Sequence, residues 1–126
     1  MPVRLNKIIF FCTDVLRLVD FYRSNFGFQV VGEADMHWTV LNAGTIEIAF
    51  HRIGDQYLSE STELMGENSN VKLVFDLDID LIQFRKNLLD KKIALGEIKK
   101  FDGVNYIVCD GQDPEGNVFQ LMQTVE

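Results

Sequence analysis

The spacing of apolar residues in the first half of the chain predicts one helix among four strands. Residues 5–13 are apolar at both even and odd positions, which indicates a strand covered on both faces. Residues 15–25 carry apolar side chains at helical spacing, with Thr13 or Asp14 as the N-cap and Gly27 as the stop. Three further strands joined by turns are predicted over the alternating runs 28–33, 38–41 and 45–51.

The same order of elements returns in the second half of the chain. Residues 71–77 alternate as a strand, and Asp78 or Asp80 can cap a helix over residues 81–91. Three short strands are predicted to follow, near residues 98–101, 106–109 and 118–122. Between the two halves, residues 54–70 are polar and short of apolar periodicity, and we interpret them as a connector.

The repeat predicts an α+β fold made of two tandem βαβββ units. Unit one covers about residues 4–53, the connector about 54–70 and unit two about 71–126, all within a single domain over residues 1–126. A chain of 126 residues is long enough to bury one core and too short for two ordinary domains.

Composition and charge narrow the function. Hydrophobic residues make up 47% of the chain and charged residues 25%, as in soluble globular proteins. The formal net charge is −7 and no basic run is present, so we expect no nucleic-acid partner. No apolar run approaches the roughly 20 residues of a membrane span, so we expect no membrane partner. The N-terminal residues lack the pattern of a secretory signal, and we expect a cytoplasmic protein.

The two cysteines are predicted to be structural. Cys12 and Cys109 lie inside apolar runs, which is where inert buried thiols usually lie. Neither has a CxxC partner or a histidine near it in the sequence.

Two short segments carry a resemblance to a known family. They are Phe21-Tyr22-Arg23-Ser24-Asn25-Phe26-Gly27-Phe28 at the exit of the first helix and Asp113-Pro114-Glu115-Gly116-Asn117 before the last strand. Together they resemble the vicinal oxygen chelate superfamily, also called the glyoxalase, bleomycin-resistance and extradiol-dioxygenase superfamily, over essentially the whole chain. The resemblance implies a pair of βαβββ units whose sheets form an open cup, with the ligand inside and the cup commonly completed by dimerisation.

The resemblance also implies where a metal would bind in metal-dependent members. The matching places hold Lys7 and Lys72 in the first strands of the two units, and Glu47 and Gln120 in the last strands. The Lys72 match depends on how Phe75-Asp76-Leu77-Asp78 is aligned. An ammonium has no lone pair for a cation, so two of the four places are spoiled and we expect no metal and no cofactor.

The histidines do not replace the missing ligands. His51 follows Glu47 by four residues in a predicted strand, which separates the two by roughly 13 Å. They cannot hold one ion together. His37 and His51 are interpreted as surface or rim residues.

The same four places form the predicted ligand site. Lys7 and Glu47 would form an ion pair if both point into the cup, and otherwise the lysines would reach the rim. The formal charges of Lys7, Lys72 and Glu47 sum to +1, which favours a small anionic ligand. The cup could be lined by Phe11, Trp38, Phe50, Tyr57 and Tyr106, although aromatic residues at strand spacing also build cores.

Two functions remain open. One is a metal-free small-molecule-binding module that resembles the bleomycin-resistance branch. The other is a lyase, isomerase or dioxygenase of the same superfamily, either metal-dependent or using a cup lysine. We expect a homodimer because an open cup leaves apolar sheet surface uncovered. The sequence leaves open whether the units pair within a chain or swap between chains.

Overall fold

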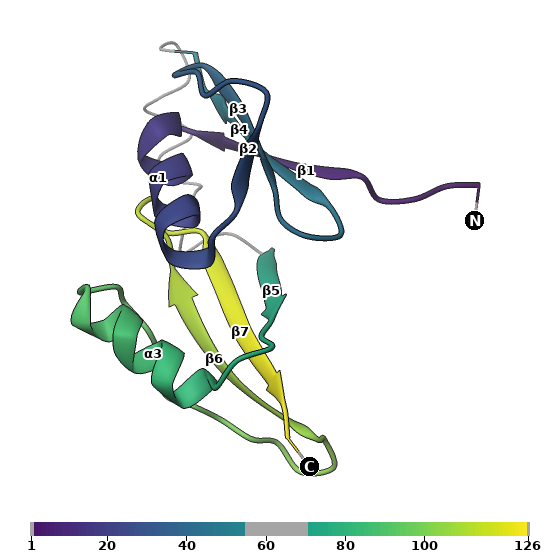
Figure 1. Ribbon diagram of the computed structural model, residues 1–126, viewed down its shortest axis with the longest axis vertical. Helices are drawn as coiled ribbons and strands as arrows, with labels where there is room; N and C mark the ends of the chain where they lie inside the picture. Colours follow the sequence, from purple (N-terminus) through teal and green to yellow (C-terminus); the bar gives the residue numbers. More distant parts are fainter. Residues whose placement is uncertain (1, 55–70, 126) are drawn as a thin grey trace. The chain divides into compact units, whose positions relative to one another are not determined.

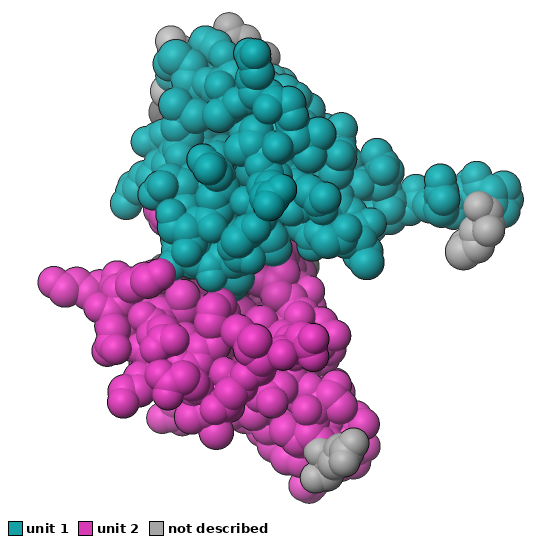
Figure 2. Space-filling view, in the orientation of Figure 1, with its two compact units in different colours: residues 1–62 teal, residues 63–126 magenta. Residues whose placement is uncertain are grey.

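The protein is described here by a computed structural model that covers residues 2–54 and 71–125. The chain divides into two compact units, Met1–Thr62 and Glu63–Glu126 (Figure 2). The boundary between them falls within the stretch expected to be a connector.

In residues 2–54, unit 1 has one helix and a sheet of four strands (Figure 1). Its strands lie in the order β1-β4-β3-β2, with β1 parallel to β4 and the other neighbours antiparallel. The elements are β1 (Lys7–Cys12), α1 (Val15–Phe26), β2 (Gln29–Val31), β3 (Trp38–Asn42) and β4 (Glu47–Arg52).

Helix α1 begins and ends where the sequence signals predict. The Asp14 carboxylate accepts a hydrogen bond from the backbone N–H of Arg17 at 3.2 Å, and Gly27 ends the helix with a left-handed φ of 74°. The helix packs on one face of the sheet, where the ring of Tyr22 stacks on Phe50 with 5.5 Å between centroids. Both rings are buried, so this face forms the core of unit 1.

The other face of this sheet stays open. Ile9 and Phe11 of β1 are 46% and 54% exposed. The prediction of a β1 strand covered on both faces is therefore wrong, because α1 covers only the face that carries Phe50 and Ile48. The open face is the one on which Lys7 and Glu47 lie.

Unit 2 repeats this plan with a smaller sheet. Its strands lie in the order β5-β7-β6, with β5 parallel to β7 and β6 antiparallel to it. The elements are β5 (Lys72–Asp76), α3 (Leu81–Asp90), β6 (Tyr106–Gln112) and β7 (Val118–Thr124). Asp80 caps α3 by accepting from the backbone N–H of Ile82 at 3.2 Å. The helix packs against β7 and buries Leu81 and Leu88.

The strand predicted near residues 98–101 is not a regular strand. Residues 94–99 instead run beside β6, joined to it by two isolated antiparallel bridges, Leu95↔Gly111 and Lys99↔Val108. This segment follows the helix and lies next to β6, as β2 follows α1 and lies next to β3 in unit 1. The tandem βαβββ plan predicted from the sequence is thus present.

The turn between β6 and β7 is held by one buried carboxylate. Asp113 is 6% exposed and accepts from the backbone N–H groups of Glu115 and Asn117 at 2.9 and 3.0 Å. It also accepts from the Asn117 side chain at 2.8 Å. Gly116 supplies the positive φ of 84° that this turn requires.

Within the part of the chain that is described, no helix is both long and apolar enough to cross a membrane.

Candidate functional site

An ion pair stands on the open face of unit 1. Lys7 and Glu47 are direct neighbours in the parallel pairing of β1 and β4, so their side chains leave the sheet on the same side. Lys7 Nζ lies 3.6 Å from Glu47 Oε1 and 5.8 Å from the centre of the Trp38 ring. The side chains are 31% and 32% exposed. Of the two alternatives for Lys7, the ion pair is therefore the one observed.

Aromatic rings continue this face next to the ion pair. The ring of His51 lies edge-on to Trp38 at 5.7 Å and 5.5 Å from the ring of Phe11. His51 is exposed, as predicted, and it joins two of the aromatic residues predicted to line the cup. These three rings offer flat, accessible surface on which a planar ligand can stack.

The other three residues predicted to line the cup are not part of this group of rings. Phe50 is fully buried under α1, and its assignment to the lining is wrong because it alternates with Ala49 and His51 to the opposite face of β4. Tyr57 lies outside the described residues. Tyr106 is half-buried at the start of β6.

In unit 2 the lysine pairs with a residue that sequence reasoning missed. Lys72 Nζ lies 3.0 Å from Asp110 Oδ2, and Gln120 Nε2 donates to Asp110 Oδ1 at 2.9 Å. Asp110 and Gln120 are direct neighbours in the antiparallel pairing of β6 and β7. Two of the predicted site residues thus meet at one carboxylate. The sequence held one signal for Asp110, namely an acidic residue directly after the apolar run Tyr-Ile-Val-Cys.

The donors around Asp110 change its proton affinity. Burial alone would raise the pKa of this carboxyl group. The hydrogen bonds from Gln120 and Lys72, and the charges of Lys72 and Lys99, outweigh burial and hold the pKa below its ordinary value. Asp110 is therefore a stable anion at neutral pH and a weak general base.

The register of the parallel strand pair differs between the two units by two residues. Glu47 lies opposite Lys7, whereas Gln120 lies opposite Val74, and Lys72 lies opposite Val118. Lys72 therefore reaches Asp110 diagonally across β7.

Counting Asp110 also alters the charge argument. In each unit the lysine is balanced by a carboxylate, Lys7 by Glu47 and Lys72 by Asp110, so the charges at the predicted places no longer favour an anion by themselves.

A hollow lies beside Asp110 on the open face of unit 2. It measures about 370 Å³, and its walls include Lys72, Glu97, Lys99, Phe101, Asp110 and Gln120. Such a volume lies at the small end of the range of pockets that take drug-sized ligands. Charged, amide and aromatic groups converge here, which makes this hollow the best-formed binding site among the described residues.

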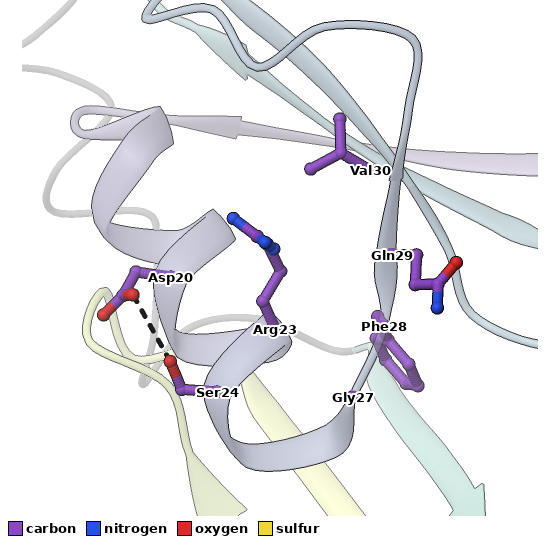
Figure 3. A pocket seen from close by; sticks show the side chains of 7 residues that line it. All are labelled: Asp20, Arg23, Ser24, Gly27, Phe28, Gln29 and Val30. Atoms are coloured by element: carbon purple, nitrogen blue, oxygen red, sulfur yellow. Dashed lines mark hydrogen bonds between the residues drawn. The ribbon is translucent and has the colours of Figure 1, made fainter.

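A larger and shallower hollow of unit 1 lies between the end of α1 and β2 (Figure 3). Asp20 and Ser24 of its wall are hydrogen-bonded to each other one helical turn apart, at 3.3 Å, and Arg23 extends between the helix and the strand (Figure 3). Its polar groups are ordinary surface groups of a helix end. We therefore assign no chemistry to this hollow.

The cysteines are inert. Cys12 and Cys109 are fully buried, as predicted. Burial raises the pKa of the Cys109 thiol, and the charge of Arg85 opposes this only in part. Cys109 is thus not a nucleophile at neutral pH.

The donors at the predicted metal places do not fit a divalent ion. Lys7 and Lys72 offer ammonium groups, and both oxygens of Asp110 already accept from Lys72 and Gln120. Residues 2–54 and 71–125 contain no group of three or more His, Cys, Asp or Glu side chains arranged to hold a metal. A structural or catalytic metal site generally needs at least three protein ligands.

Comparisons of the whole chain find similar solved structures. The fosfomycin resistance protein FosX from Listeria monocytogenes matches with a TM-score of 0.78 at 10% identity, over 99% of this chain and 96% of that one. A glyoxalase/bleomycin resistance protein/dioxygenase family enzyme from Burkholderia phytofirmans matches with a TM-score of 0.76 at 21% identity, over 98% and 100%. The chain has the glyoxalase/bleomycin-resistance fold.

Other structures with this fold have different descriptions. The virulence protein STM3117 from Salmonella typhimurium matches with a TM-score of 0.70 at 18% identity, over 98% of both chains. No sequence-family model and no curated protein sequence matches the chain. At these identities the likeness establishes the fold alone, and it is the fold that the sequence resemblance predicted. A fold that supports many activities does not choose among them.

Proposed function

We propose that this chain is a metal-free small-molecule-binding protein, with its ligand on the open sheet face of unit 2. The observation that carries the proposal is that Lys7 and Lys72, which the resemblance matches to metal-ligand places, form ion pairs with Glu47 and Asp110. Each lysine supplies a positive charge where a metal-dependent relative would place an ion. A ligand can be bound there by hydrogen bonds and charge without any metal.

A second candidate is an enzyme of the same superfamily, a lyase, isomerase or dioxygenase. The similar structure from Burkholderia phytofirmans, described as an enzyme, favours it. In that case the chemistry is either metal-dependent or carried by a lysine such as Lys7 or Lys72.

Metal content distinguishes the two candidates. We expect elemental analysis of protein purified without chelator to find zinc, nickel, manganese and iron far below one ion per chain. We also expect no change in Tm when each ion is added to the chelator-treated protein, because a bound metal would stabilise the folded state. Near-stoichiometric metal would contradict the proposal.

Ligand binding is the direct test. A library of small molecules screened by ¹H–¹⁵N NMR should yield compounds that shift amides of β6, β7 and residues 94–101 together. Lys72→Met should weaken this binding, because it removes the ammonium that pairs with Asp110 in this sheet. A catalytic lysine would instead be revealed by loss of turnover of a bound compound in Lys7→Met or Lys72→Met.

A cytoplasmic homodimer that binds a small molecule, without a nucleic-acid or membrane partner, remains our expectation from the sequence.

A further inference from the structure

The segment beside β6 contains one extra residue. Between the bridges Leu95↔Gly111 and Lys99↔Val108, the segment advances by four residues while β6 advances by three. Two residues, Glu97 and Ile98, therefore face Cys109 alone, which is the arrangement of a β-bulge.

The bulge moves Lys99 to the other side of the sheet. Leu95 lies on the face of Gly111, where a Cβ added to Gly111 would come within 2.5 Å of the Leu95 side chain. Strict alternation from Leu95 would place Lys99 on that same, helix-covered face. Because of the extra residue, Lys99 lies opposite Val108, and so on the open face that carries Asp110.

Hydrogen bonds hold the bulge on both sides. Arg85 Nε of α3 donates to the carbonyl of Gly96 at 2.9 Å, and the Gly96 N–H donates to the carbonyl of Asp110 at 2.8 Å. Lys99 and Val108 exchange backbone hydrogen bonds of 2.8 and 3.0 Å. The backbone position of Lys99 is thus fixed by its neighbours rather than by its own side chain.

Lys99 brings a second ammonium to this face. Lys72 is paired with Asp110, whereas no carboxylate of residues 2–54 or 71–125 forms an ion pair with Lys99. Lys99 nevertheless helps to hold the pKa of Asp110 low, so its ammonium acts on the same hollow. Glu97 also lines the hollow, so the formal charges of its four charged residues sum to zero. Lys99 is therefore positioned to bind an anionic group through its own ammonium, not through a net positive charge of the hollow.

We propose that Lys99 anchors a compact anionic group of the ligand, a carboxylate or a phosphate, in the hollow beside Asp110. This inference rests on the proposed function and narrows it to anionic ligands. Phe101, which shares the face of Lys99 two residues on and is 58% exposed, offers apolar surface for the rest of the ligand. Gly96, opposite Asp110, leaves room for it because it carries no side chain.

The test compares charged and neutral probes of one shape. Benzoate and benzamide are titrated into ¹⁵N-labelled protein, with inorganic phosphate as a third probe. We expect benzoate to shift amides of residues 96–101 and 108–110 and to bind about tenfold more tightly than benzamide, as a charge-assisted hydrogen bond predicts. Lys99→Met should remove this preference and leave benzamide unchanged. Phosphate shifting the same amides would show that the anionic group alone is recognised.

Lys100→Met is the matched control. It removes the same charge one residue away, from a side chain whose Nζ donates to the carbonyl of Val104 at 2.8 Å. It should change benzoate affinity less than twofold. Equal loss in both variants, or benzoate binding no tighter than benzamide, would overturn the role of Lys99 while leaving the binding function intact. If no probe and no library compound shifts these amides, the binding function fails as well.

Discussion

Two donors from different strands converge on the carboxylate of Asp110. Lys72 comes from β5 and Gln120 from β7, and each binds a different oxygen of Asp110 in β6. The pairing across three strands orders side chains that would otherwise be mobile on an open face. The exposed fractions of Lys72 and Asp110, 43% and 49%, keep the direct contribution of the ion pair to stability small.

This arrangement predicts the titration of Asp110. Carboxyl ¹³C NMR should show Asp110 titrating below its ordinary pKa of 3.8. In Lys72→Met the pKa should rise, because one hydrogen bond and the nearest positive charge are lost. Lys86→Met, on the surface of α3, serves as the control and should leave it unchanged. An unchanged pKa in Lys72→Met would show that the ion pair does not form in solution.

The same shift predicts how stability depends on pH. Since the pKa of Asp110 is lower in the folded protein, the unfolded chain takes up the proton first as pH falls. The stabilisation is complete above the ordinary pKa and disappears as pH falls through the folded pKa. The difference in unfolding free energy between the wild type and Asp110→Asn should therefore shrink below about pH 4. Urea unfolding at pH 7 and pH 3 measures it, and a difference that grows on acidification would contradict the assignment.

Substitution of Asp113 should have a large effect on the free energy of unfolding. Asp113→Ala removes the acceptor of three hydrogen bonds in a buried turn and should lower the unfolding free energy by about 2 kcal/mol. Asp102→Ala, in an exposed turn, should change it by less than about 0.5 kcal/mol. Chemical denaturation of both variants provides the comparison, and equal effects would show that the Asp113 bonds add little.

At the scale of elements, local signals in the sequence predicted most of the fold. Both helix starts and the Gly27 stop follow from capping residues that act on their own neighbours. The failures concern features that depend on distant partners. The bulge of residues 94–99 is defined only by its pairing with β6, and Phe50 belongs to the core only because α1 covers that face. Neither partner can be read from local periodicity.

Close packing beside the bulged segment predicts that Gly111 and Gly96 differ in how well they tolerate a side chain. A Cβ at Gly111 would lie 2.5 Å from the side chain of Leu95 and 2.6 Å from that of Phe119, both packed beneath the sheet. Gly111→Ala should therefore destabilise the protein by about 2 kcal/mol through overpacking. At Gly96 the nearest atom would be 3.7 Å away, so Gly96→Ala should be nearly neutral. Thermal unfolding of the two variants should differ accordingly, and equal Tm values would show that the packing relaxes freely.

For the whole molecule, the family resemblance explains how much of the site was predictable. It pointed to Lys7, Glu47, Lys72 and Gln120, and all four lie on open sheet faces. The partner of Lys72 was missed because Asp110 lies in β6, and the four matched places lie only in the first and last strands of the units. Lys99 was missed because the bulge reverses its face. Both depend on which strands become neighbours.

The open face of unit 1 predicts self-association of the whole chain. Ile9, Phe11, Val31 and Trp38 on this face are 46%, 54%, 45% and 37% exposed, more apolar surface than isolated exposed residues provide. We expect sedimentation velocity at micromolar concentration to give twice the chain mass of 14.5 kDa. Ile9→Ser should weaken the dimer about tenfold, since it removes most of the apolar area of one side chain from the contact.

The control for this prediction is an equal change on another surface. Ile82 on α3 is 62% exposed, and Ile82→Ser should leave the dimer unchanged if association uses the open sheet face. A wild-type monomer at micromolar concentration would contradict the dimer itself. Ile9 lies on β1 between Lys7 and Phe11, whereas Ile82 lies on α3. A dimer weakened equally by both substitutions would therefore show that the contact is not confined to the open sheet face.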